Sequence, residues 1–239
     1  MPEYRRPHHR LVGSALKRMD AGFLARTECY FGGGTLLAMT LGEYRESRDI
    51  DFLCSSRDGF RSLRETVTDR SLGAIFRQSV DLAREVRADR DGIRTFLKVG
   101  DVPIKFEIIL EARIDLEGAI DKTLGVPTLR RECAIAEKFL ANADRGLDES
   151  TLSRDLVDLS FIAAHAGRPP LEKGMEIAEQ AYGTAVQRSL QLSLDGFRGN
   201  RSRANAHIRS LGVEDTQTLR KGLQLLRKLV QDQEPKKGV

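Results

Sequence analysis

The sequence predicts an α+β protein with two parts, a mixed sheet with flanking helices over residues 1–125 and a helical bundle over residues 126–239. The first observation behind this prediction is that short runs of alternating apolar and polar residues, separated by turn residues, are concentrated before residue 125. The second is that helical periodicity dominates after Pro127. The third is the length of 239 residues, which is enough for one or two domains.

The first part is predicted to mix helices and strands. Apolar residues three and four apart indicate helices, and strict alternation of polar and apolar residues indicates half-buried strands. Turn residues such as Asp91-Gly92 separate the strands. The predicted helices are 10–26, 35–41 and 57–68, and the predicted strands are 29–31, 49–53 and 104–109, the last within a region of strands and turns from 81 to 111.

The second part is predicted to be all-helical. Its apolar residues recur with the period of a helix, and glycine, proline and asparagine residues separate the successive segments. Neither an internal repeat nor a low-complexity tract interrupts it before the polar last residues. The predicted helices are 128–143, 150–166, 171–182, 184–194, 201–211 and 215–232.

Composition excludes several classes of protein. With 40% hydrophobic and 31% charged residues, the chain is neither a disordered polypeptide, a collagen-like fibre nor a simple coiled coil. No apolar run is long enough to cross a bilayer, and the basic start of the chain is not followed by the apolar stretch of a secretory signal. Three widely spaced cysteines predict a reducing compartment, so we expect a cytoplasmic protein without a membrane partner.

A glycine-rich turn stands between a predicted strand and a predicted helix, at Gly32-Gly33-Gly34-Thr35. Glycines there let the backbone approach a ligand without interference from Cβ atoms. The first N–H groups of the following helix have no partner within that helix, and its positive end favours a phosphate. A glycine turn alone is also common as a purely structural feature, so the turn becomes informative only together with its surroundings.

Three carboxylates stand on the two clearest strands. Asp49 and Asp51 are two residues apart, so in a strand both point to the same face while Ile50 packs on the other. On the later strand Glu107 lies on the polar face, and it joins the aspartates if the two strands are neighbours. Like charges held together favour a divalent cation between them, and carboxylate oxygens suit Mg²⁺ or Mn²⁺. The alternative is an exposed strand whose acids meet water and nearby basic residues.

Other familiar motifs fail. The glycines lack the third glycine of a dinucleotide fingerprint, and the lysine of a P-loop is missing. The four histidines and three cysteines lack the spacing of metal ligands. Cations do gather late in the helical part, where they favour either a solvated helix face or contact with an RNA backbone: Arg198, Arg201, Arg203, His207 and Arg209.

The order of these motifs resembles a known family. A glycine turn with Thr35, a helix, and then D-I-D-F at Asp49–Phe52 resembles the nucleotidyltransferase signature of the polymerase-β-like superfamily. More narrowly, GGTLLAMTLG followed by R-E-S-R-D-I-D-F looks like the AbiEii/AbiGii family, the toxin half of type IV toxin–antitoxin and abortive-infection systems. That family also has a lysine-bearing helix followed by an R-D-x-x-D-L helix, found here around Lys138 and from Arg154 to Leu159. The three motifs cover about residues 30–160.

The resemblance implies a nucleotidyltransferase-type sheet in the first part and a role for each matching residue. By it, Gly33, Gly34 and Thr35 cradle the phosphates of a nucleoside triphosphate, and Asp49 and Asp51 bind Mg²⁺ or Mn²⁺ with Glu107 as third ligand. Lys138 meets the triphosphate, and Asp155 serves the catalytic helix. Two departures are the additional glycine, Gly32, and a glutamate as the third acid.

The residues of the later helices also allow plainer interpretations. Lys138 is a point charge suited to phosphate oxygens, or an ordinary lysine of an amphipathic helix. Asp155 and Asp158 share one helix face, and Arg154 lies four residues from Asp158. We therefore predict that Asp158 is structural and that Asp155 is functional.

The function expected from the resemblance is metal-dependent transfer of a nucleotide to an RNA acceptor such as the tRNA 3′ end, by a toxin with a cognate antitoxin. Nucleotidylation of a protein hydroxyl is an alternative acceptor chemistry, with small molecules as a third. A nucleotide-binding module without turnover is the alternative outside the enzymes. The net charge of +4 permits a nucleic-acid partner without requiring one.

Overall fold

The computed structural model describes residues 4–233 and confirms an α+β protein, with a mixed sheet and its helices followed by a helical region. The chain divides into two compact units, Met1–Arg130 and Arg131–Val239. The division falls later than the predicted boundary at residue 125 because a short strand over residues 127–129 pairs with the sheet. We call the two units the sheet unit and the helical unit.

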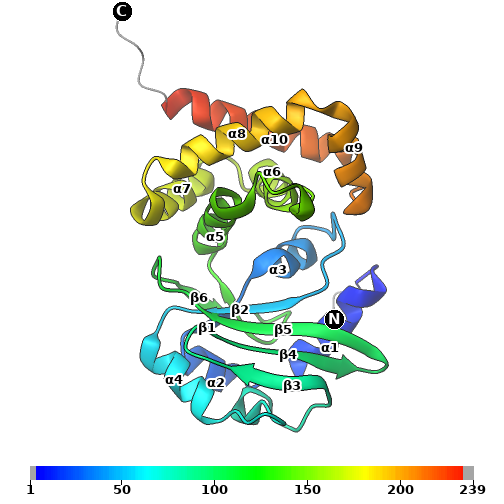
Figure 1. The fold of residues 1–239 in the computed structure, drawn as a ribbon, viewed down its shortest axis with the longest axis vertical. Coiled ribbons are helices and arrows are strands. Elements are labelled where there is room, and N and C mark those ends of the chain that lie inside the picture. The colour runs from blue at the N-terminus through cyan, green and yellow to red at the C-terminus, as the bar shows by residue number, and fades with distance from the viewer. Residues whose placement is uncertain (1–3, 234–239) are drawn as a thin grey trace, which may run out of the picture. The chain divides into compact units, whose positions relative to one another are not determined.

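The sheet unit contains one seven-stranded sheet in the order β3-β4-β5-β2-β1-β7-β6 (Figure 1). Two neighbouring pairs, β2 with β5 and β1 with β7, are parallel, and the other pairs are antiparallel. The strands are β1 (Cys29–Phe31), β2 (Ile50–Cys54), β3 (Leu82–Ala88), β4 (Gly92–Val99), β5 (Val102–Leu110), β6 (Gly118–Ile120) and β7 (Pro127–Leu129).

Alternation along the central strands separates an apolar face of the sheet from a polar face. In β2 and β5 the residues Phe52 and Phe106 are fully buried, and their rings lie 6.2 Å apart between centroids. Their neighbours along the chain, Asp51 and Glu107, point to the opposite face and are partly exposed. The core therefore fixes which face carries the acids, because a slip of one residue would exchange the two sets.

The helices of the sheet unit flank both faces of the sheet, with α2 and α4 on one side and α3 on the other (Figure 1). The predicted helix 10–26 is two helices, because the chain turns after Lys17 and Asp20 then caps a new helix by accepting from the N–H of Phe23 at 2.7 Å. The helices are α1 (Pro7–Lys17), α2 (Ala21–Arg26), α3 (Gly33–Thr40) and α4 (Arg57–Glu65), with a short 3₁₀ turn over Gly73–Ile75.

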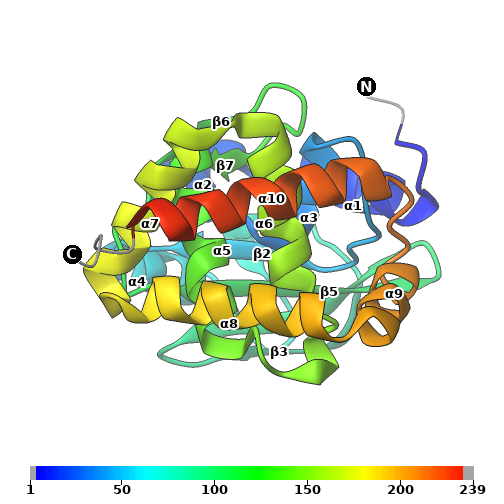
Figure 2. The same ribbon diagram turned by 90° about the horizontal axis from the view of Figure 1, so that it is seen from above.

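The helical unit is built from six α-helices and one 3₁₀ turn within the described part of the chain. Helices α8 and α10 run in opposite directions, and both pack on the central helices of this unit (Figure 2). No helix among residues 4–233 combines the length and the apolar composition needed to cross a membrane. The helices are α5 (Arg131–Arg145), α6 (Arg154–Ala166), α7 (Arg168–Tyr182), α8 (Ala185–Gly199), α9 (Arg201–Ser210) and α10 (Thr216–Gln233), with the 3₁₀ turn at Glu149–Thr151.

Candidate functional site

The glycine turn lies directly against one of the predicted metal-binding aspartates. Gly33 has φ +68°, and a Cβ atom on it would stand 2.6 Å from Oδ2 of Asp51. The backbone of the turn is also tied to β2, since the N–H of Gly32 donates to the carbonyl of Asp51 at 2.9 Å. Only glycine fits this position without strain or collision, so the turn and the carboxylate form one compact arrangement at the start of α3.

The additional glycine has a packing reason. A Cβ atom on Gly32 would lie 2.8 Å from Cδ1 of Leu129, on the short strand that pairs with β1. Gly32 therefore lets β7 close onto the sheet, and its presence does not disturb the turn formed by Gly33.

Thr35 is fully buried, and its hydroxyl donates to Oγ of Ser47 at 2.8 Å. The N–H of Ser47 donates to Nε2 of His9 at 3.3 Å, and Nδ1 of the same ring is 2.8 Å from Oε1 of Glu43. This chain of contacts joins the first turn of α3 to the loop that leads to Asp49. The side chain of Thr35 is thus engaged within the protein, and its contribution to phosphate binding would come from the backbone.

The pair of His9 and Glu43 is a buried anchor for that loop. Glu43 also accepts hydrogen bonds from the backbone N–H groups of Arg5 at 2.6 Å and Arg6 at 3.0 Å. Burial lowers the pKa of His9 more than its hydrogen bond to Glu43 raises it. Burial would raise the pKa of Glu43, but the two backbone N–H donors and His9 together lower it. Glu43 is thus an ionised acceptor that holds the N-terminal segment to the loop.

Asp51 and Glu107 face each other in register on the parallel strands β2 and β5. Residues in register on neighbouring strands share a face of the sheet, about 4.8 Å apart, so the structure brings these two acids together. Asp49 precedes β2 and is partly exposed. Within residues 4–233, however, no three acidic, histidine or cysteine side chains are already gathered as a metal site.

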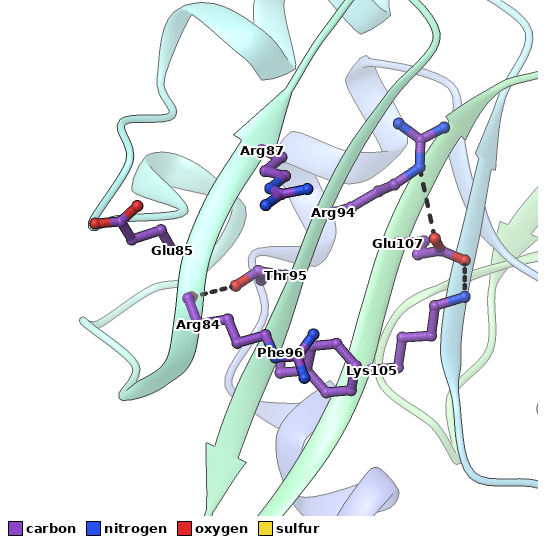
Figure 3. Close-up of a pocket in the computed structure, with 8 residues that line it drawn as sticks. All are labelled: Arg84, Glu85, Arg87, Arg94, Thr95, Phe96, Lys105 and Glu107. Atoms are coloured by element: carbon purple, nitrogen blue, oxygen red, sulfur yellow. Dashed lines mark hydrogen bonds and ion pairs between the residues drawn. The ribbon is translucent and has the colours of Figure 1, made fainter.

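Glu107 is engaged by two cations of the same sheet face. Its Oε2 is 2.6 Å from Nζ of Lys105, and its Oε1 is 3.5 Å from Nε of Arg94 (Figure 3). The side chains of Lys105 and Arg94 are 41% and 37% exposed, so these ion pairs are weak and can exchange. The donor set of Asp51, Glu107 and Asp49 consists of hard carboxylate oxygens and suits Mg²⁺ or Mn²⁺. For Glu107 to bind such a metal, it must release Lys105 and Arg94.

The predicted residues of the helical unit form a buried charge cluster. Nζ of Lys138 lies 3.0 Å from Oδ1 of Asp155 and 2.8 Å from Oδ2 of Asp158. Arg145 makes a two-point contact with Asp155, through Nε at 2.7 Å and Nη2 at 3.1 Å. Two cations and two carboxylates balance one another, and we call these four residues the helical cluster. Because its cations bind carboxylates, Lys138 can contact a phosphate only by giving up part of its contact with Asp155 and Asp158.

Electrostatics keep Asp155 ionised in this cluster. Burial alone would raise its pKa, but Lys138 and Arg145 outweigh burial and hold the pKa well below the ordinary value. Two residues shortly before it, Leu152 and Ser153, have left-handed backbone conformations with φ +55°. Ser153 is anchored there by a contact of 3.1 Å between its hydroxyl and Nδ1 of His207. The chain thus enters α6 in a strained but supported conformation.

Asp158 is fully buried and bound to Lys138. The sequence prediction paired it with Arg154 and missed the lysine, because i,i+4 spacing reports only neighbours on the same helix. The late cations of the helical unit also differ in environment. Arg203 pairs with Glu149 and His207 contacts Ser153, so both have structural partners.

Alternation along the strand places Lys105 on the same face as Glu107, but sequence reasoning missed Arg94, the second cation beside Glu107. Arg94 lies on β4, and only the register of β4 with β5 brings it to Glu107. A partial signal was present, since basic residues recur through the segment 84–105. The structure forms a pocket of about 550 Å³ from that segment, lined by Arg84, Glu85, Arg87, Arg94, Thr95, Phe96, Lys105 and Glu107 (Figure 3).

Comparison with solved structures shows which fold class this is. A crystal structure of a candidate nucleotidyltransferase from H. pylori aligns with TM-score 0.56 and 20% sequence identity, over 95% of this chain and 96% of that one. The crystal structure of JHP933 from Helicobacter pylori aligns with TM-score 0.54 and 19% identity, over 94% of this chain and 93% of that one. The chain therefore shares the fold of these two proteins along nearly its whole length.

The family follows from the sequence. The family model of the nucleotidyl transferase AbiEii toxin, type IV toxin–antitoxin system, matches residues 15–234. The protein belongs to this family of nucleotidyltransferase toxins, as its motifs predict. Among the curated proteins compared with the chain, none matches its sequence.

Proposed function

We propose that this nucleotidyltransferase transfers a nucleotide from a nucleoside triphosphate to an RNA acceptor, such as the tRNA 3′ end, with release of pyrophosphate. The observation that carries the proposal is the contact between Gly33 and Asp51 beside the facing acid Glu107. A phosphate-binding turn next to paired carboxylates is what metal-assisted phosphoryl chemistry requires. As a member of a type IV toxin family, the protein is also proposed to have a cognate antitoxin.

In this proposal the sheet unit binds the reacting groups. The first N–H groups of α3, at Gly33, Gly34 and Thr35, hold phosphate oxygens, because a helix start offers unsatisfied donors and a positive dipole end. Asp49, Asp51 and Glu107 hold the divalent cation, which supplies charge stabilisation at the reacting phosphate and lowers the pKa of the attacking hydroxyl. The contacts from Thr35 to Ser47 and from Ser47 to His9 tie the loop that leads to Asp49 to the turn.

The helical unit contributes Lys138 and Asp155 to the same reaction. Lys138 supplies a positive charge for the triphosphate. Asp155 and Asp158 hold that lysine in place, and Arg145 keeps Asp155 ionised. Asp155 is therefore proposed to act at least partly through Lys138. Substituting it should affect nucleotide binding as well as turnover.

The test of the proposal is a transfer assay. The protein is incubated with each of the four α-labelled nucleoside triphosphates, Mg²⁺ and total tRNA, and label is followed on RNA after separation from protein. We expect transfer by the wild-type protein and a loss of about 100-fold or more with Asp51→Asn, because a metal ligand is removed while the side-chain shape is kept. Asp101→Asn is the matched control, since Asp101 is an exposed aspartate in the turn between β4 and β5.

Three results would contradict the proposal. Label that stays on a polypeptide band after ribonuclease treatment would identify a protein hydroxyl as the acceptor. Binding of Mg²⁺-nucleotide by calorimetry without transfer to any acceptor would indicate a nucleotide-binding module. Equal loss in Asp51→Asn and Asp101→Asn would exclude Asp51 from a specific role.

A further inference from the structure

The polar face of the sheet continues from the acids into a strongly basic surface. One cross-strand row runs Arg87, Arg94, Glu107 and Asp51, because each residue is in register with the next over β3, β4, β5 and β2. A second row on the same face is formed by Arg84, Phe96 and Lys105. All residues of the two rows except Asp51 line the pocket of about 550 Å³, which lies entirely within the sheet unit.

The pocket has the two kinds of group that bind a nucleic-acid strand. Four cations face two glutamates in its lining, and Figure 3 shows Glu85 directed away from Glu107. Arg87 is exposed and has no ion-pair partner among residues 4–233. The guanidinium of Arg84 lies over the ring of Phe96, with 4.6 Å between Cζ and the ring centroid. A phenyl ring and an arginine plane are the surfaces on which unpaired bases stack.

We propose that this basic sheet pocket (Arg84, Arg87, Arg94, Phe96 and Lys105) binds a single-stranded segment of the acceptor RNA. Its phosphates contact the basic side chains, and one base stacks on Phe96 and Arg84. The cross-strand row of side chains then leads the RNA toward Asp51. Asp51 lies three β-strand spacings, or about 14 Å, from Arg87. The identity of the strand as the acceptor rests on the proposed function, whereas its binding in the pocket does not.

A single strand fits these observations better than a duplex or an acidic protein. Stacking on Phe96 requires a base that is not already stacked in a helix. An acidic protein would use the cations but would leave the flat pair of Arg84 and Phe96 without a matching group. Recognition through phosphates and stacking is tolerant of sequence, so the pocket would fix the position of the strand rather than the identity of its bases.

Binding is tested with a fluorescein-labelled, mixed-sequence single-stranded oligoribonucleotide, by anisotropy, without nucleotide and without divalent metal. Phe96→Ala should weaken binding about ten-fold, and Phe96→Tyr should restore it, because a base stacks on either ring. Arg87→Ala should weaken binding about three- to ten-fold and reduce the slope of log affinity against log salt by about 0.7, the value for one phosphate contact.

The matched control is Arg64→Ala, since Arg64 is an exposed arginine on α4 outside the pocket, and it should bind as the wild type does. Unchanged affinity in Phe96→Ala and Arg87→Ala would overturn the proposal. An equal loss of RNA affinity in Arg64→Ala would also overturn it. So would duplex RNA that binds as tightly as the single strand and loses as much affinity in the pocket variants. Loss of antitoxin binding in the pocket variants, with RNA binding intact, would assign the pocket to a protein and also overturn it.

The two proposals fail in different ways. Asp51→Asn should abolish transfer but keep RNA binding, because it removes a negative charge from the end of the row. If Asp51→Asn abolishes transfer while the pocket variants bind RNA normally, the proposed function stands and the pocket proposal is wrong. If the pocket variants lose RNA affinity in a protein that transfers no nucleotide, the pocket stands and the proposed function is wrong.

Discussion

The two units of the protein use the same charges in opposite surroundings. In the sheet unit, Lys105 and Glu107 pair at 2.6 Å, with side chains 41% and 18% exposed. In the helical unit, Lys138 pairs with two aspartates at 3.0 and 2.8 Å, with side chains 7%, 1% and 0% exposed. Water screens the first pair, so it can exchange partners, whereas the buried cluster depends on all of its members. The exposed pair of the sheet unit can therefore receive new ligands, whereas the helical cluster holds a fixed charge.

The largest expected effect is the loss of Lys138. Lys138→Met leaves two buried carboxylates with one cation fewer, and we expect a fall of about 3–5 kcal/mol in the unfolding free energy of the helical unit. Denaturation is followed by circular dichroism, because the protein has no tryptophan. Lys173→Met is the control, since Lys173 forms an exposed pair with Glu176 on α7. Equal losses in the two variants would show that burial of the cluster does not matter.

Acid should weaken the helical cluster next. Because the pKa of Asp155 is lowered in the folded protein, the unfolded state binds more protons in acid, and the stabilisation is lost as pH falls below the ordinary value of 3.8. We expect the urea midpoint of the wild type to decline between about pH 5 and about pH 2. Asp155→Asn should start less stable and decline less steeply. A parallel decline in both proteins would exclude Asp155 as the source.

Gly33 tests how tightly the sheet unit is built around Asp51. Gly33→Ala combines an unfavourable backbone conformation with a collision at Oδ2 of Asp51, for which we expect a loss of about 1–3 kcal/mol in stability and a large fall in transfer. Gly100→Ala is the control, since Gly100 has φ +61° but no atom within 4 Å of its would-be Cβ. The difference between the variants measures the collision itself. Normal nucleotide transfer by Gly33→Ala would show that the turn is not part of the site.

The smallest expected effect is at Lys105. Lys105→Met removes an exposed partner of Glu107, and we expect the unfolding free energy to change by less than about 1 kcal/mol. The same denaturation experiment that measures Lys138→Met checks this value. A loss as large as that of Lys138→Met would show that the ion pairs of the sheet face are structural, and the contrast between the two units would disappear.

The local pattern of apolar and polar residues predicts much of the fold. The faces of β2 and β5 follow from alternation alone, so the sequence predicts that Asp51 and Glu107 stand opposite the apolar residues. Whether they meet was conditional on the two strands being neighbours, and the parallel register now shows that they are. The short strand at Pro127–Leu129 escaped prediction because three residues carry too little periodicity, and its place depends on Phe31.

Contacts between distant segments could not be predicted. His9 lies in a basic stretch that gives no hint of its partner, yet on α1 it is buried against Glu43 in the loop after α3. The link from Lys138 to Asp158 joins two helices, and spacing within one helix cannot reveal it. The basic sheet pocket likewise exists only because three strands are in register. The roles of the candidate residues in the reaction stay predictions until the variants are measured.

The shared register of β2 and β5 limits how the gene can change. An insertion or deletion of one codon within β5 would turn Lys105 and Glu107 toward the apolar side and bring Phe106 to the surface. The exposed turn at Gly100 and Asp101 has no such constraint. A scan of single-codon insertions should therefore yield active toxins with changes in the turn and none with changes in the strand. We therefore expect this chain to tolerate lengthening only in the connections between its strands.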